Sequence, residues 1–117
     1  MTAAKTKTIA LIAGASYTLG LSKPLTIAGE EFATITLREP LANDLRGISI
    51  SQLQMSDGES VLKLLERITD IHEENLQRLS IADLGSLSNV ILGFLFPQQM
   101  PTILDGIKAA GVDLTVA

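Results

Sequence analysis

The chain has 117 residues, a length at which one domain buries about 65% of the surface that its unfolded form would expose. Apolar residues make up 46% of the chain and charged residues 19%, which excludes an intrinsically disordered protein. The absence of cysteine excludes disulfides, thiolate nucleophiles and cysteine metal sites, and the formal net charge of -4 argues against nucleic acid as a main partner.

The N-terminal residues resemble a targeting segment only superficially. Lys5 and Lys7 precede a strongly apolar run at residues 9–12 that Gly14 soon interrupts, whereas a signal peptide needs an apolar core of about 7 to 15 residues. The most apolar later window, residues 90–96, is far shorter than the roughly 18 residues that a membrane-spanning helix requires. We therefore expect a soluble cytoplasmic protein without a membrane partner.

The first part of the chain has the alternation of a β-hairpin. Apolar and polar side chains alternate over residues 17–22 and again over 33–38, which is typical of half-buried strands. The turn is predicted at residues 28–30, and Pro24 is expected to interrupt the first strand because proline cannot donate to a ladder. An isolated hairpin is marginally stable in water, so we expect its apolar face to lie on helices or on another copy of the protein.

After Pro40 the apolar period changes to that of helices. Ser56 and Glu59 have the spacing of a capping box, and Asp70 with Glu73 repeats it. The helix predicted from the first of these boxes carries one apolar stripe, made of Val61, Leu64, Leu65 and Ile68.

Two further helices are predicted towards the C-terminus. Ser80 with Asp83 forms a third cap, and the helix that it starts must end before Pro97. The last helix is expected to begin near Pro101, a favourable first-turn residue, and to stop at Gly111.

Strands thus precede helices, without the alternation of a βαβ protein, and this order predicts the α+β class. We expect a single domain over residues 1–117. Its strand-rich part, 1–40, is predicted to form an N-terminal β-hairpin or small antiparallel sheet. A bundle of three to four short helices is predicted over 41–111, and a tail over 112–117.

Residues that could carry catalysis are few. His72 is the only histidine and lies beside Glu73 and Glu74, so a metal site would lack further histidine or cysteine ligands. An enzyme would have to depend on His72 or on a carboxylate pair such as Asp70 and Glu73. We expect no catalytic residue, no cofactor and no metal ion.

The helix predicted to end before Pro97 is apolar on two sides. Leu84, Leu87 and Ile91 share one face, whereas Val90 and Phe96 point away from it. Such a helix is either buried all round in a compact core or covered by a partner, and both interpretations stay open. If a partner covers it, the contact surface lies within residues 90–107 and contains Val90, Phe94, Phe96, Met100 and Ile103.

Several motifs occur in an order that is similar to one known family. Residues 21–29, 35–40 and 44–47 read LSKPLTIAG, ITLREP and DLRG, and residues 64–69, 79–84 and 94–95 follow them. This series resembles the tail assembly chaperones of Mu-like and related contractile-tailed bacteriophages. The resemblance covers about residues 16–96.

The resemblance implies a non-enzymatic protein of the host cytoplasm that binds the long, helical tape measure protein and helps to recruit tail tube subunits. We also expect a homo-oligomer, since a marginal hairpin and surplus apolar helix surface both need partners. The alternative is a structural subunit of a phage tail or a related contractile assembly.

Two motif residues have two interpretations each. Arg38 and Arg46 either contribute to an interface or tie the hairpin to the first helix through carboxylates or helix carbonyls. We favour the second interpretation.

Overall fold

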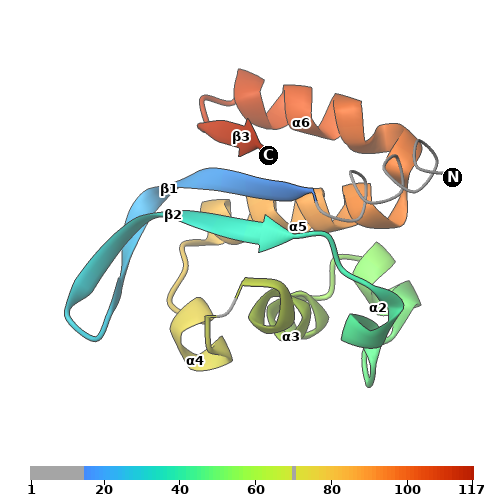
Figure 1. Cartoon of the computed structure of the whole chain (residues 1–117), viewed down its shortest axis with the longest axis horizontal. Coiled ribbons are helices and arrows are strands. Elements are labelled where there is room, and N and C mark those ends of the chain that lie inside the picture. The colour runs from blue at the N-terminus through green and yellow to red at the C-terminus, as the bar shows by residue number, and fades with distance from the viewer. Residues whose placement is uncertain (1–14, 70) are drawn as a thin grey trace, which may run out of the picture.

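The computed structural model describes residues 15–69 and 71–117, which form a three-stranded antiparallel sheet and a set of short helices (Figure 1). This arrangement confirms the predicted α+β class. Among the described residues, no helix has both the length and the apolar character needed to cross a membrane. The elements in chain order are β1 (Ser16–Ile27), β2 (Glu30–Arg38), η1 (Ala42–Leu45), α2 (Ile50–Gln54), α3 (Gly58–Thr69), α4 (Glu73–Leu76), α5 (Ile81–Leu95), η2 (Pro97–Gln99), α6 (Met100–Ala109) and β3 (Leu114–Val116).

The predicted hairpin is confirmed, and the geometry of its turn accounts for the residues found there. Ala28 and Gly29 connect the strands with φ values of 52° and 84°, and two left-handed residues match the twist of a two-residue hairpin turn. The expected interruption at Pro24 is also present, because the strand register shifts between Gly20 and Leu25. Residues 21–24 of β1 lie opposite the single residue Ala33, so the amides of this bulge have no ladder partner in β2.

A third strand completes the sheet in the order β2-β1-β3. Thr115 of β3 lies opposite Thr18 of β1, and Gly20 donates its N–H to the Asp113 carbonyl over 2.8 Å. The strand lies within residues 112–117, which the sequence analysis assigned to a tail. It is three residues long, too short for an alternation pattern to predict it.

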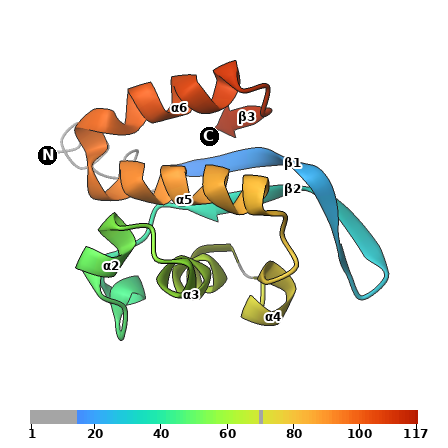
Figure 2. The same cartoon turned by 180° about the vertical axis from the view of Figure 1, so that it is seen from behind.

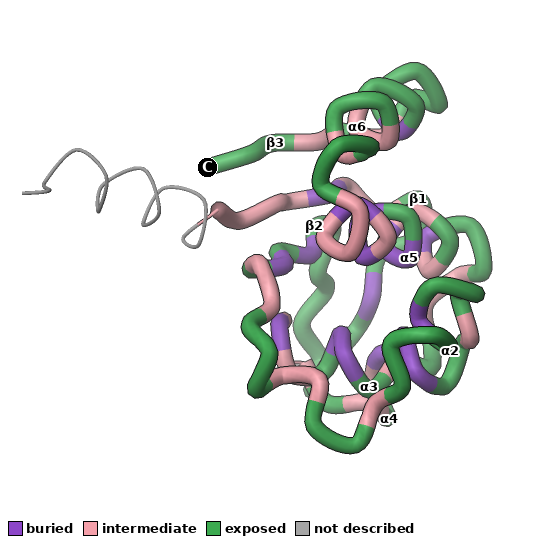
Figure 3. Tube along the Cα trace, turned by 90° about the vertical axis from the view of Figure 1, so that its right-hand side faces the viewer, coloured by how far each residue is buried: buried purple, intermediate pink, exposed green. Residues whose placement is uncertain are grey.

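Helix α5 lies in the middle of the fold, and its position explains its two apolar sides. It packs against β1, α2 and α6 (Figures 1 and 2), while α3 covers β2. Leu87 and Val90 have no exposed surface, and Ile91 is 1% exposed. Figure 3 shows the buried residues concentrated on the sheet, α3 and α5, whereas α6 buries Ile107 alone.

The predicted helix starts were correct at one cap and wrong at another. Ser80 caps α5 as expected, accepting the Asp83 N–H over 3.2 Å. Helix α3 is capped by Asp57, which accepts the Ser60 N–H over 3.0 Å, so the cap predicted at Ser56 is wrong by one residue. Ser56 has φ of 56° and lies in the turn after α2, a conformation that an N-cap does not adopt.

The other two predicted helix limits have different outcomes. Asp70 lies outside the described residues, and α4 follows His72, which occupies its N-cap position without a side-chain cap. Helix α6 carries Pro101 in its first turn and is followed by Gly111 with φ of 89°, as expected for that helix.

Candidate functional site

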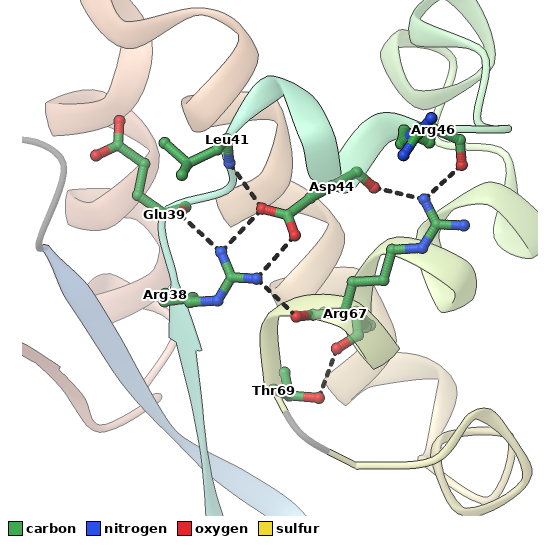
Figure 4. A network of polar contacts seen from close by, with 8 residues as sticks. Arg38, Glu39, Leu41, Asp44, Arg46, Arg67 and Thr69 are labelled. Atoms are coloured by element: carbon green, nitrogen blue, oxygen red, sulfur yellow. Dashed lines mark hydrogen bonds and ion pairs between the residues drawn. The ribbon is translucent and has the colours of Figure 1, made fainter.

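An arginine and an aspartate from two of the sequence motifs form the centre of a polar network (Figure 4). Arg38, at the end of β2, donates from Nη1 and Nη2 to the two carboxylate oxygens of Asp44, each over 2.8 Å. The backbone N–H of Leu41 donates to the same carboxylate over 2.8 Å. Such paired hydrogen bonds define both the distance and the orientation of the two groups, so β2 and η1 are joined in one geometry.

The network continues into the last turn of α3. Arg38 Nη2 donates to the Arg67 carbonyl over 2.9 Å, one of the carbonyls that lack a partner at a helix C-terminus. Arg67 Nη1 in turn donates to the carbonyls of Asp44 and Arg46, each over 2.6 Å. Arg38 therefore ties the hairpin to a helix, as we favoured; Arg46 enters the network through its carbonyl.

The carboxylate of Asp44 lies between two positive side chains, Arg38 and Arg67. The pKa of Asp44 is lowered below its usual value, chiefly by the hydrogen bonds from Arg38. The Leu41 N–H and the charge of Arg67 contribute further, and together these effects outweigh burial, which alone would raise the pKa. Asp44 has a side chain that is 12% exposed, against 48% for Arg38. The carboxylate is thus the inner member of the pair and stays ionised at neutral pH.

An apolar pocket of about 120 Å³ lies beside the network, between η1 and the C-terminal half of α5. One wall of the pocket is η1, which begins four positions after Arg38 in the sequence. The contacts of Asp44 described above hold this wall in place. Leu41, on the outer wall, is 61% exposed, although it is a large apolar side chain. The pocket is lined by Pro40, Leu41, Ala42, Leu45, Leu64, Ile91, Phe94 and Leu95.

The five residues predicted to form a contact surface differ in how far they are buried. Val90 is in the core with no exposed surface, because α5 is covered on both sides, so it cannot line an exposed surface. Phe94 lines the apolar pocket and packs edge-on against Tyr17, with ring centroids 5.3 Å apart. Phe96, Met100 and Ile103 are half-buried.

Two of those half-buried residues belong to helix packing. Met100 and Ile103 pack against the core, and Met100 lies so close to Gly93 that a β-carbon there would overlap its sulfur. Three residues that meet Phe94 at the pocket were not predicted from the sequence: Pro40, Leu41 and Leu45. Their position within and after the LREP motif was visible, but their approach to α5 depends on the tertiary fold.

Comparison with known proteins identifies the family. A family profile described as "Phage tail assembly chaperone proteins, E, or 41 or 14" matches residues 18–95. The chain belongs to this family. The matched residues of this tail assembly chaperone contain both the Arg38–Asp44 network and the whole lining of the apolar pocket, whereas α6 and β3 lie beyond them.

Two curated relatives come from Escherichia phage P2. Tail assembly protein E is 29% identical over 82 residues, which span 68% of this chain and 90% of that protein. Tail assembly protein E′ is 30% identical over 77 residues, which span 64% of this chain and 54% of that protein. No solved structure matches the chain.

Proposed function

We propose that this family member is a non-enzymatic chaperone of the host cytoplasm that binds the tape measure protein during tail assembly. The observation that carries the proposal is an apolar pocket with an exposed leucine, Leu41, inside the segment that the family shares. An exposed apolar side chain beside a well-formed apolar pocket is typical of protein contact sites.

The dimensions of the pocket suit a side chain of a polypeptide. Pockets for drug-sized ligands and cofactors measure about 300–1,000 Å³, whereas this one is about 120 Å³. An amphipathic helix buries its apolar stripe in such a site by inserting single anchors. A long helical client would present many such anchors, and covering them would keep it soluble.

The pocket wall offers a variant that separates binding from folding. Leu41→Asp places a charge where a bound apolar side chain would lie, and the exposed position of Leu41 keeps the core intact. Met55→Asp is the matched control, because Met55 is 80% exposed and does not line the pocket. Each variant is co-expressed with the tape measure protein of the same phage, and the soluble client and the eluted complex are measured.

We expect the unaltered protein and Met55→Asp to keep the client soluble and to elute with it. Leu41→Asp should weaken the complex at least about tenfold, the usual effect of losing an interface anchor. If the unaltered protein leaves the client equally insoluble and no complex elutes, the proposal fails. If this protein itself is found in stoichiometric amounts in purified tails, it is a structural subunit instead.

Self-association and recruitment of tail tube subunits belong to the same proposal. Large apolar side chains outside the pocket support it, since Ile50 and Ile81 are 50% and 85% exposed. Light scattering of the purified protein is expected to give a mass above that of one protomer. A protomer mass at all concentrations would remove self-association from the proposal, and pull-down with purified tube subunits tests recruitment.

A further inference from the structure

A second groove lies on another part of the molecule, between the hairpin and residues 69, 71, 72 and 75 at the end of α3 and around the start of α4. It measures about 470 Å³ and shares no residue with the apolar pocket. Ile27 and Phe32 of the hairpin and Ile71 after α3 contribute apolar surface to it. Phe32 is 38% exposed, so part of an aromatic ring is available to a partner.

Two sets of hydrogen bonds hold the hairpin beside the helices and keep this groove in shape. Arg78, just after α4, donates from Nη2 to the Thr26 carbonyl over 2.6 Å and to Asn75 Oδ1 over 2.7 Å. At the other end of the hairpin arm, Asp83 accepts the backbone N–H groups of Ser22 and Lys23 over 2.8 and 3.3 Å. These hydrogen bonds therefore fix the hairpin relative to the helices on the other side of the groove.

The surroundings of the groove are acidic on both sides. Glu30 is exposed and lies two residues before Phe32, on the same face of the hairpin. Glu66, Glu73 and Glu74 border a shallow adjoining hollow that shares His72 with the groove.

The nearby arginines, Arg67 and Arg78, offset only part of this charge, because they bring two positive charges against the four glutamates Glu30, Glu66, Glu73 and Glu74. Arg67 donates to the carbonyls of Asp44 and Arg46, and Arg78 donates to Thr26 and Asn75. His72 Nδ1 lies 3.7 Å from Glu66 Oε2. The rim therefore keeps a negative charge.

We propose that this groove docks a cationic amphipathic segment of a partner protein. Apolar side chains of that segment lie against Ile27, Phe32 and Ile71, and its Lys or Arg residues pair with the glutamates of the rim. A second copy of this chain fits the groove poorly, because its net charge of -4 brings like charge to the rim. The proposal does not depend on the apolar pocket and stands if binding of the tape measure protein there fails.

The test uses a synthetic probe of the proposed chemistry. The probe is a fluorescent amphipathic peptide of about 14 residues with leucine on one face and lysine on the other, and its twin carries glutamate in place of lysine. Binding to the full chain is measured by fluorescence anisotropy. The lysine peptide should bind at least about tenfold more tightly than the glutamate peptide, and salt should weaken it.

Two double variants with the same loss of charge locate the site. Glu30→Gln with Glu73→Gln removes one carboxylate on each side of the groove, and Glu59→Gln with Asp105→Asn removes two exposed carboxylates that do not border the groove. The first should weaken the lysine peptide by about five- to tenfold and the second by less than twofold. Phe32→Ala should weaken it without changing its salt dependence, and circular dichroism checks that each variant is folded.

Three results would overturn the proposal. Equal affinity for the lysine and glutamate peptides would show that charge does not select the partner. Equal effects of the two double variants would show that binding follows net charge and not the groove. Formation of a dimer that competes with the peptide and depends on Phe32 would identify a second copy of the chain as the occupant.

Discussion

The carboxylate of Asp83 accepts a hydrogen bond of 2.8 Å from the backbone N–H of Ser22, although the two residues are 61 positions apart. Asp83 lies in the first turn of α5 and is 5% exposed. Ser22 belongs to the bulge of β1, where the amides lack a partner in β2. One side chain thus satisfies the irregular part of the hairpin and joins it to the central helix.

Replacing this carboxylate should destabilise the protein. Asp83→Asn keeps the size of the side chain but removes its charge, and hydrogen bonds to charged groups contribute about 1.5–3 kcal/mol. We expect the free energy of unfolding to fall by about 1.5–3 kcal/mol in a urea titration. Asp105→Asn, on an exposed position of α6, should change it by less than about 0.5 kcal/mol. Equal values for the two variants would contradict the role of Asp83.

Stability should fall in acid as carboxylates with a lowered pKa become protonated, among them Asp83 and Asp44. Burial alone would raise the pKa of Asp83, but hydrogen bonds from Ser22, Ser80 and Lys23 outweigh it and lower that pKa; the pKa of Asp44 is also lowered, chiefly by Arg38. An unfolded Asp has a pKa of about 3.9. The stabilisation is therefore complete above that pH and is lost as the pH falls towards the lower folded values.

Variants show which carboxylate contributes to the loss of stability in acid. Urea titrations between about pH 6 and pH 2.5 should show a smaller loss of stability for Asp83→Asn than for the unaltered protein, because one of the linked carboxylates is gone. Asp105→Asn again serves as the control and should retain the full loss. An unchanged acid slope in Asp83→Asn would show that this group is not linked to folding.

Arginine at position 38 should not be replaceable by lysine. Lysine has a single ammonium group, which cannot make the two parallel bonds to Asp44 and also reach the Arg67 carbonyl. Because the Arg38 side chain is 48% exposed, we expect Arg38→Lys to cost only about 1 kcal/mol in urea unfolding. Arg46→Lys keeps the carbonyl that the network uses and should be nearly neutral.

Two glycines should respond to alanine with opposite signs. Gly29 has φ of 84° in the hairpin turn, where an alanine is strained, so Gly29→Ala should lower the unfolding free energy by about 1 kcal/mol. Gly85 lies inside α5, and a β-carbon there would meet nothing within 4 Å. Gly85→Ala should therefore raise stability by about 0.5–1 kcal/mol. Thermal unfolding measures both, and a shift of the same sign would contradict the assignment.

Local patterns in the sequence determined the hairpin, its interruption at Pro24 and the cap at Ser80. Each depends on residues that are close along the chain, and their steric and hydrogen-bonding requirements act before any tertiary contact forms. The motif order also determined the family. The cap at Ser56 was misplaced because Asp57 competes for the same role one residue later.

Only the tertiary structure decided which apolar residues are available to a partner. Val90 is enclosed because α5 packs on both sides, whereas Leu41 stays exposed beside a pocket whose walls come from residues about fifty positions apart in sequence. Strand β3 exists through its pairing with β1, and Asp83 finds Ser22 across the fold. A periodic pattern shows which residues are apolar, but burial depends on what each face meets after long-range packing.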